Sequence, residues 1–226
     1  MDSDSESVEV RWADRTISIF EYGPMAGLQT PAERPCNAGV HTHVLDYLTE
    51  AANLCHRISH AEIEKMAEAL DGCRQMKAKV YIVGLGGSLA NAIHMAADLR
   101  KLCEIDAEAF DNIAELTARA NDEGLESIFV DWLSETTVWD KLIVLSVGGG
   151  TSVVSQSICK AIDAFKGQVL GIVGPHGGYT ASKASICIKI PVENEKHVTP
   201  HTEAFQAVIW HLLVSHPLLQ KNKTTW

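Results

Sequence analysis

The 226-residue chain has few of the features that identify a nucleic-acid-binding or membrane protein. It contains no basic block beyond the short tail Lys221-Asn-Lys223, and its formal net charge is −10. A polyanion would therefore be repelled rather than attracted. No window approaches the roughly 18 uncharged apolar residues of a membrane span, and the acidic N-terminus is unlike a secretory signal. These absences predict a soluble cytoplasmic protein with no nucleic-acid and no membrane partner.

Paired cysteines are also missing. The six cysteines are scattered, without a C-x-x-C pair and without zinc-ribbon spacing. Most fall in apolar or helical stretches, where a cysteine is usually a small buried hydrophobic residue. We therefore expect reduced, mostly buried thiols and a reducing compartment.

The sequence divides into an N-terminal arm, residues 1–40, and one main domain, residues 41–226. Apolar and polar residues alternate over 8–12 and 17–20, which indicates a short β-ribbon followed by a loop. Helical spacing of apolar residues predicts a first helix from about 43 to 58. Ser59 and Glu62 then form an S-x-x-E capping box, which indicates the start of a second helix.

After Ala78, short β-rich runs alternate with helical segments. We expect strands at 80–83, 105–110, 142–146, 169–173 and 186–190. Helices are expected near 89–102, 112–121, 125–134, 151–165, 178–184 and 200–215. Alternation of this kind predicts an α/β fold, a doubly wound parallel five-stranded sheet of the flavodoxin type with helices on both faces.

Two glycine-rich loops follow predicted strands and open predicted helices. The first reads Gly84-Leu-Gly-Gly-Ser88 and the second Ser146-Val-Gly-Gly-Gly-Thr-Ser152. In open parallel sheets, ligands bind beyond the carboxyl ends of the strands, where helix N-termini attract anions. Glycine lets the backbone approach an anion closely, and Ser88 offers a hydroxyl and a helix N-cap. The two loops predict phosphate binding, although tight packing of a strand against a helix also requires glycine.

Neither loop matches a nucleotide-binding motif. No G-K-[ST] tripeptide is present, and the first loop lacks the third glycine of the dinucleotide pattern. We therefore expect a small phosphorylated ligand and no nucleotide cofactor.

These loops and their flanking residues resemble the sugar isomerase (SIS) domain family, and within it the phosphoheptose isomerases, over roughly residues 40–216. The family's G-x-G-G-S motif, with a histidine and an acid on the next helix, is matched by Gly84 to Ser88, His94 and Asp98. Its other motifs are matched by Asn121-Asp-Glu-Gly124, Ser146-Val-Gly-Gly-Gly-Thr151 and Gly174-Pro-His-Gly-Gly178. The resemblance implies an SIS-type fold and a homotetramer with sites at subunit interfaces. It also implies isomerisation of sedoheptulose 7-phosphate to D-glycero-D-manno-heptose 7-phosphate through an enediolate.

Several positions depart from the family pattern. Val147 and Gly148 replace hydroxyl residues in the second loop, so a phosphate would rely more on backbone amides. Asp98 replaces a longer Glu, and Glu203 stands where a Gln precedes the catalytic His211 by eight residues. A different register, anchored on the family's Gln-Glu pair, would place Trp210 at the catalytic position.

Isomerisation chemistry and the resemblance together single out four residues. Ketose to aldose conversion needs a base, an acid and a group that stabilises the developing oxyanion. His94 and Asp98 share a helix face, and with Glu203 and His211 they form a set able to transfer protons or to hold a Zn²⁺-type ion. Eight residues of helix span about 12 Å, so Glu203 and His211 cannot easily meet within one helix.

The predicted catalytic residues are therefore Asp98, Glu203 and His211, and the candidate metal ligands are His94, Asp98, Glu203 and His211. Predicted substrate and phosphate ligands are Gly86, Gly87, Ser88, Asn121, Asp122, Ser146, Gly148, Thr151 and Ser152. His197 and His201 are second choices for the site. Outside the resemblance, His211 would read as a hydrogen-bonded core or interface histidine, and Glu203 as a charge favoured at a helix N-terminus. The alternative function is a non-catalytic SIS module that binds a sugar phosphate or a protein partner.

Overall fold

The structure is a computed structural model that describes residues 8–12, 15–19, 38–150 and 155–223. The chain forms two compact units, Met1–Leu45 and Asp46–Trp226. The division falls after Leu45, within helix α1 (Ala38–Arg57), and the domain boundary at residue 40 stays a prediction. Helix α1 also begins before residue 43, where the apolar spacing predicted its start.

In the first unit, two short strands form an antiparallel ribbon. Strand β1 (Val8–Trp12) pairs with β2 (Arg15–Ile19), with Val8 opposite Ile19. The predicted ribbon is confirmed, although its second strand begins earlier than expected. The predicted loop that follows it lies outside the described residues.

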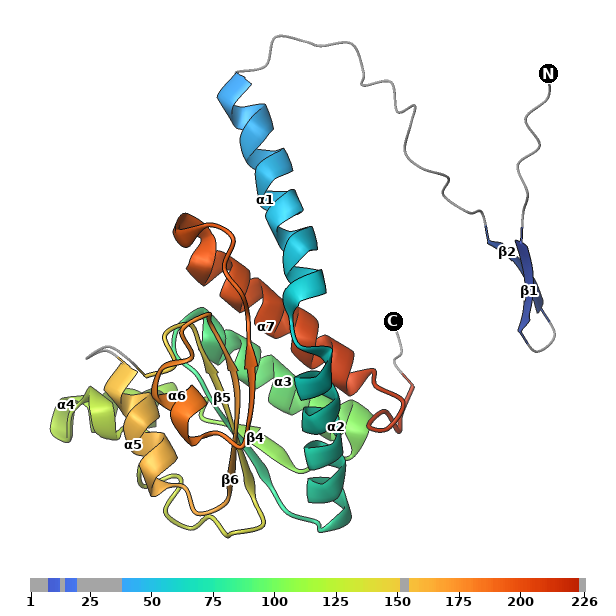
Figure 1. The fold of residues 1–226 in the computed structure, drawn as a ribbon. Coiled ribbons are helices and arrows are strands. Elements are labelled where there is room, and N and C mark those ends of the chain that lie inside the picture. The colour runs from blue at the N-terminus through green and yellow to red at the C-terminus, as the bar shows by residue number, and fades with distance from the viewer. Residues whose placement is uncertain (1–7, 13–14, 20–37, 151–154, 224–226) are drawn as a thin grey trace, which may run out of the picture. The chain divides into compact units, whose positions relative to one another are not determined.

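Within the described part of the second unit, five strands form one sheet in the order β4-β3-β5-β6-β7 (Figure 1). All neighbouring pairs are parallel. The predicted α/β fold with a doubly wound five-stranded sheet is therefore confirmed. The strands are β3 (Val80–Val83), β4 (Ala107–Ala109), β5 (Lys141–Ser146), β6 (Gln168–Val173) and β7 (Ile186–Lys189).

The central strands are apolar because both faces of the sheet are covered. In β5, Ile143 and Leu145 belong to one hydrophobic core, whereas Leu142 and Val144 belong to the other. Successive side chains point to opposite faces of a strand, so a strand between two helical layers buries every residue. This is why the β5 run carries almost no polar side chain.

Helices cover both faces of the sheet (Figure 1). The larger core joins the sheet to one set of helices, α2 (His60–Gln75), α3 (Gly87–Cys103) and α7 (Val198–Val214), together with Leu54 of α1. The smaller core joins it to α4 (Ile113–Asp122), α5 (Gln156–Ala164) and α6 (Gly178–Lys183). Among the described residues, no helix is long and apolar enough to cross a membrane.

The predicted helix start at Ser59 is confirmed, although the Glu62 carboxylate accepts from Lys65 and from the backbone N–H of Cys187 rather than completing the capping box. The Ser59 hydroxyl accepts a hydrogen bond from the backbone N–H of Glu62 over 3.3 Å, and α2 begins at His60, the residue after Ser59. This bond satisfies one of the N–H groups that a helix start leaves without a partner.

The prediction of a helix over 125–134 is wrong. A single 3₁₀ turn, Leu125–Ser127, is followed by non-helical turns. Ile128, Phe129 and Leu133 are fully buried in the smaller core. Their helix-like spacing reflects packing of a compact loop against the sheet rather than a regular helix.

The strand order reverses at β3, which has β4 on one side and β5 on the other. The helices that follow β3 and β5, α3 and α5, accordingly pack on opposite faces of the sheet, the arrangement at which open α/β sheets bind ligands. The two glycine-rich loops follow these two strands. The fold thus brings both predicted phosphate loops to the position where open α/β sheets bind ligands.

The described cysteines are predicted to differ strongly in reactivity. Cys73 and Cys103 are buried, and burial raises the pKa of both thiols to about 11. Few thiolates then exist at neutral pH, and the sulfur atoms are covered. With a thiol-labelling reagent and mass spectrometry, we expect exposed Cys55 to react quickly and Cys73 and Cys103 to react only after denaturation. Labelling of Cys73 at the rate of Cys55 would contradict this core.

Candidate active site

The first loop joins β3 to α3 through glycines that cannot be replaced easily. Gly86 is the N-cap residue of α3 and has φ of +58°, a conformation that side chains disfavour. A Cβ atom on Gly84 would lie 2.5 Å from the carbonyl oxygen of Ser88. Ser88 itself is buried within the helix, so the prediction that it caps α3 is wrong. The cap is backbone only, because Gly86 takes the conformation that the turn requires.

The carboxylate of Glu203 lies directly over the start of α3. A Cβ atom on Gly87 would collide with the Glu203 carboxylate. Asn91 fixes this arrangement, because its Nδ2 donates to the Glu203 carbonyl oxygen over 2.9 Å and to Gln206 Oε1 over 3.2 Å. Gly87 therefore admits an acidic side chain from α7 to the N-terminus of α3, where negative charge is favoured.

The second loop is packed against the turn that precedes α6. Gly149 has φ of +63°, and a Cβ atom there would collide with the carbonyl oxygen of Gly177. Thr180 donates to the Gly149 carbonyl oxygen from its backbone N–H over 2.8 Å and from its hydroxyl over 3.0 Å. The hydroxyl of Ser146 accepts from the N–H of Gly149 over 3.0 Å. This close approach explains why the loop requires a glycine at position 149.

Predicted phosphate ligands in this loop are only partly described. Ser146 is buried beneath the loop, and Gly148 approaches Gly178 closely. Thr151 and Ser152 lie outside the described residues. The described half of the loop therefore offers mainly backbone groups.

Three of the four residues predicted for chemistry come together. Donor atoms of His94, Asp98 and His211 all lie within 4.8 Å of one another. His94 Nε2 is 3.7 Å from Asp98 Oδ2, and the His94 and His211 ring centroids are 5.7 Å apart. The two histidines are exposed and Asp98 is half-buried. This group, here called the α3–α7 group, is open to solvent on one side.

The orientation of His211 is set by its own helix. Its Nδ1 lies 2.8 Å from the carbonyl oxygen of Ala207. A carbonyl oxygen only accepts, so Nδ1 carries a proton and Nε2 of the neutral ring keeps its lone pair. Trp210, which the alternative register placed at the catalytic position, is 1% exposed and belongs to the core. The geometry therefore favours the register anchored on His211.

Glu203 does not join the α3–α7 group. It lies beside Gly87, whereas His94 and His211 meet further along the same two helices. Seven residues of helix separate Gly87 from His94, a rise of about 10 Å. The predicted four-residue set is thus divided into a carboxylate at the first loop and a three-residue group about two turns away.

The predicted sugar contacts at the end of α4 are separate again. Asn121 Nδ2 donates to Asp122 Oδ1 over 2.7 Å, and Gly124 turns the chain with φ of +93°. Within the described residues, no hydrogen bond links Asn121 or Asp122 to either glycine loop. Their role in substrate binding stays a prediction.

A second polar cluster contains the two histidines that the sequence offered only as second choices. Glu50 Oε2 lies 2.7 Å from His197 Nδ1 and 2.9 Å from His201 Nε2. The hydrogen bond with His197, followed by those with Asn194 and His201, lowers the pKa of Glu50 to about 2. The H-x-x-x-H spacing signals that the two rings share a helix face. Nothing in the sequence pairs them with Glu50, because almost 150 residues separate the partners.

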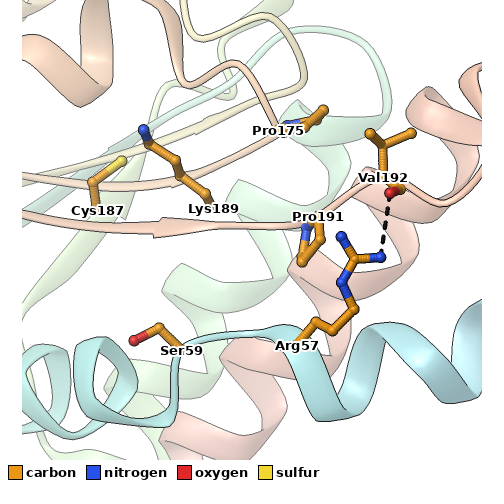
Figure 2. A pocket seen from close by; sticks show the side chains of 7 residues that line it. All are labelled: Arg57, Ser59, Pro175, Cys187, Lys189, Pro191 and Val192. Carbon is orange, nitrogen blue, oxygen red and sulfur yellow. Dashed lines mark hydrogen bonds between the residues drawn. The ribbon is translucent and has the colours of Figure 1, made fainter.

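Figure 2 shows a pocket of about 480 Å³ beside β7, lined by Arg57, Ser59, Pro175, Cys187, Lys189, Pro191 and Val192. Arg57 Nη1 donates to the Val192 carbonyl oxygen over 3.4 Å and also pairs with Glu193. No residue predicted for the site lines this pocket. It is therefore distinct from both glycine loops.

Comparison with known proteins shows that the chain is similar to phosphoheptose isomerases in sequence and in fold. No family model matches the chain. A phosphoheptose isomerase from Rhodospirillum rubrum is 32% identical over 145 residues, which cover 60% of this chain and 73% of that protein. A phosphoheptose isomerase from Syntrophotalea carbinolica is 28% identical over 191 residues, covering 79% and 93%. The structure of the phosphoheptose isomerase from Neisseria gonorrhoeae shares the fold, with a TM-score of 0.68 and 22% identity over 77% of this chain and 96% of that one.

The sheet order, the two glycine loops at its switch point and the crossing of α3 with α7 define a sugar isomerase domain of the SIS type. Within this class, the identity to the Rhodospirillum rubrum protein is decisive. The chain belongs to the phosphoheptose isomerase family.

Proposed function

We propose that this protein interconverts a ketose phosphate and an aldose phosphate, with sedoheptulose 7-phosphate and D-glycero-D-manno-heptose 7-phosphate as the pair. One observation carries the proposal. Two glycine loops stand at the switch point of the sheet, and the helix that leaves the first of them bears His94 and Asp98 beside His211. Phosphate binding and proton-transfer groups are thus attached to one element, α3.

The substrate phosphate is proposed to bind at the two loops. Helix N-termini carry positive partial charge and orient N–H groups toward an anion. The predicted ligands Gly86, Gly87 and Ser88 begin α3, and Ser146, Gly148, Thr151 and Ser152 lead into the α5 segment. Backbone amides carry more of the binding here, because Val147 and Gly148 lack the hydroxyls of the family pattern.

Proton transfer is assigned to Asp98 and His211. Isomerisation removes a proton from one carbon, returns it to the neighbouring carbon, and moves a hydroxyl proton between the two oxygens. The Asp98 carboxylate is proposed to handle the carbon-bound proton. His211 Nε2, whose lone pair is fixed by the Nδ1 hydrogen bond to Ala207, is proposed to handle the hydroxyl proton.

Glu203 lies at the first loop, away from the α3–α7 group. The distance between the loop and this group sets the length of a substrate that reaches both. A substrate held by phosphate at the loops must extend about 10 Å along α3 to bring its reactive carbons to His94, the member of the α3–α7 group nearest the loops. An extended seven-carbon sugar phosphate is of this length, and a triose phosphate is much shorter. Glu203 is then proposed to contact the sugar between its phosphate and its carbonyl end.

As an alternative to direct proton transfer, the α3–α7 group would hold a Zn²⁺-type ion, and Asp98 and His211 would then be ligands rather than proton carriers. Two imidazoles and one carboxylate are a common zinc ligand set that leaves a position open for substrate. The three donor atoms are near enough to converge on one ion with small side-chain movements. When bound, such an ion would polarise the substrate carbonyl and stabilise the enediolate oxygens.

Assembly as a homotetramer is proposed from the surface around this group. Ile93, Val208 and Leu212 are exposed large apolar residues on the same two helices as His94 and His211. A second copy packed there would bury them and exclude water from the site. A cytoplasmic location also stays a prediction from the sequence.

The proposal is tested with a panel of ketose phosphates of three, five and seven carbons, each assayed with and without Zn²⁺. We expect the highest kcat/KM for the seven-carbon substrate. Absence of turnover for every member would overturn the proposed activity. If the triose phosphate were turned over equally well, the inferred substrate length would be wrong, and the proposed isomerase activity would stand.

The Glu203→Gln variant tests whether Glu203 only contacts the substrate or acts as the catalytic base. The Glu203 carboxylate lies at the N-terminus of α3, where it repels a bound phosphate. Removing this charge is expected to lower KM roughly 3- to 10-fold, the effect of about 1 kcal/mol of repulsion between partly solvated charges, with little change in kcat. Exposed Glu68→Gln on α2 is the matched control. A large fall in kcat would instead make Glu203 the base.

The second candidate function is a non-catalytic module that binds a sugar phosphate. It is favoured by the second loop, where Ser146 bonds to Gly149 and where Val147 and Gly148 lack the family's hydroxyls. Such a module would be stabilised by the ligand according to its concentration relative to Kd. A higher melting temperature with sedoheptulose 7-phosphate, without any turnover, would decide for this function.

A further inference from the structure

A cluster of three metal-binding side chains lies apart from the proposed catalytic group. It consists of Glu50 on α1 and of His197 and His201 at the start of α7. Ten residues of α7 separate His201 from His211, a rise of about 15 Å, so the two groups cannot share an ion. We propose that Glu50, His197 and His201 form a second binding site for a Zn²⁺-type divalent ion, which clamps α1 to the start of α7.

The donor atoms already converge. Glu50 Oε2 lies 2.7 Å from His197 Nδ1 and 2.9 Å from His201 Nε2, and all three atoms lie within 4.8 Å of one another. Ligand atoms around a tetrahedral zinc are about 3.4 Å apart, as follows from zinc–ligand distances near 2.1 Å. The two distances from Glu50 to the imidazoles therefore need to lengthen by only about 0.5 to 0.7 Å to admit an ion.

Neighbouring side chains hold these ligands in orientation. Asn194 Nδ2 donates to Glu50 Oε1 over 3.0 Å, which directs the other carboxylate oxygen toward the two rings. Tyr47 stacks on His201 with ring centroids 4.2 Å apart and meets His197 edge-on at 5.1 Å. Metal sites typically have a supporting shell of this kind, which fixes carboxylate and imidazole orientation.

The burial of the cluster also suits a metal clamp. The side chain of His201 is 5% exposed, and those of Glu50 and His197 are 14% and 18% exposed. One side therefore remains open for an ion to enter and for water to complete its coordination. The pair of His216 and Glu64 shows how an ordinary surface contact differs from this cluster. The two side chains are 3.2 Å apart, Glu64 is 64% exposed, and among the described residues no second histidine joins them.

The clamp would strengthen a helix that has few buried attachments. From Asp46 to the end of α1, Leu54 is the one fully buried side chain of the described residues. Further attachments in this stretch are partly buried Ala51, the stacking of Tyr47 on His201, and polar contacts of Arg57 with Val192 and Glu193. An ion held by Glu50 and both histidines would therefore lower the frequency at which α1 separates from the core.

The test is zinc stoichiometry of the full-length protein, measured by elemental analysis after chelation, reloading with Zn²⁺ and desalting. Glu50→Gln keeps the size of the side chain and removes the charged ligand. We expect it to lose one zinc ion per chain relative to the unchanged protein. His216→Gln, the matched control, should lose none. A double variant, His94→Gln with His211→Gln, should retain the ion at Glu50, so this proposal stands independently of the proposed isomerase activity.

Limited proteolysis provides the second readout. Zn²⁺ is expected to slow cleavage within α1 of the unchanged protein and of the His94→Gln, His211→Gln variant, but not of Glu50→Gln. Circular dichroism verifies that each variant is folded, and His201→Gln replaces Glu50→Gln if the latter is not. Equal zinc content in Glu50→Gln and the unchanged protein, or no zinc in the double variant, would overturn the proposal.

Discussion

Asp98→Asn is expected to lower kcat for the heptose phosphate by about 10²- to 10⁴-fold, the contribution of a positioned acid or base. The amide keeps the size of the side chain but cannot accept the carbon-bound proton. Because Asp98 also belongs to the α3–α7 group with His94 and His211, zinc content is expected to fall with it. Steady-state kinetics and elemental analysis measure both effects.

The control is Glu64→Gln, which changes another carboxylate that contacts a histidine. Glu64 lies on α2 and pairs with His216, which follows α7. Both residues are outside the proposed site. Its kcat should equal that of the unchanged protein. If Asp98→Asn also kept kcat within a few-fold, Asp98 would not be the base, and catalysis would have to be sought at Glu203 beside the first loop.

Gly149→Ala is expected to lower the free energy of unfolding by about 2–4 kcal/mol, through left-handed backbone strain and overpacking. The residue has φ of +63°, and its Cβ atom would collide with the carbonyl oxygen of Gly177. The second loop must then move from Thr180, which holds it by two hydrogen bonds. Binding of the sugar phosphate should weaken as well. Chemical denaturation measures the first effect and calorimetric titration the second.

Gly72→Ala is the matched control, because Gly72 lies in α2 with no atom within 4 Å of an added Cβ. There the substitution should stabilise the protein by about 0.5–1 kcal/mol, since alanine favours a helix over glycine. A Gly149→Ala protein as stable as Gly72→Ala would show that the second loop is not constrained by its packing against Gly177.

Local sequence signals were sufficient to predict the fold and the two loops. The buried strands are short apolar runs. The four-residue S-x-x-E pattern that begins at Ser59 marks the start of α2. The segment 125–134 could not be predicted in this way. Its apolar residues have helical spacing, but Gly124, with φ of +93°, begins a compact loop whose side chains fill the smaller core.

The site was predictable where its residues share one helix. His94 and Asp98 are four residues apart, and the structure joins them to His211 as the sequence suggested. The position of Glu203 depends on how α3 and α7 cross, which places it against Gly87 rather than beside His211. Glu50 was not found, because its partners His197 and His201 lie 147 and 151 residues away and no local pattern connects them.

The measurement that tests the central claim most directly is NMR of sedoheptulose 7-phosphate incubated with the full-length protein in D₂O, with Zn²⁺ present. An enediolate formed at Asp98 exchanges its proton with solvent, so we predict an aldoheptose 7-phosphate that carries deuterium at C2. Asp98→Asn should form little of it. If the unchanged protein formed no aldose, or formed aldose free of deuterium while Asp98→Asn remained fully active, the isomerase account would be contradicted.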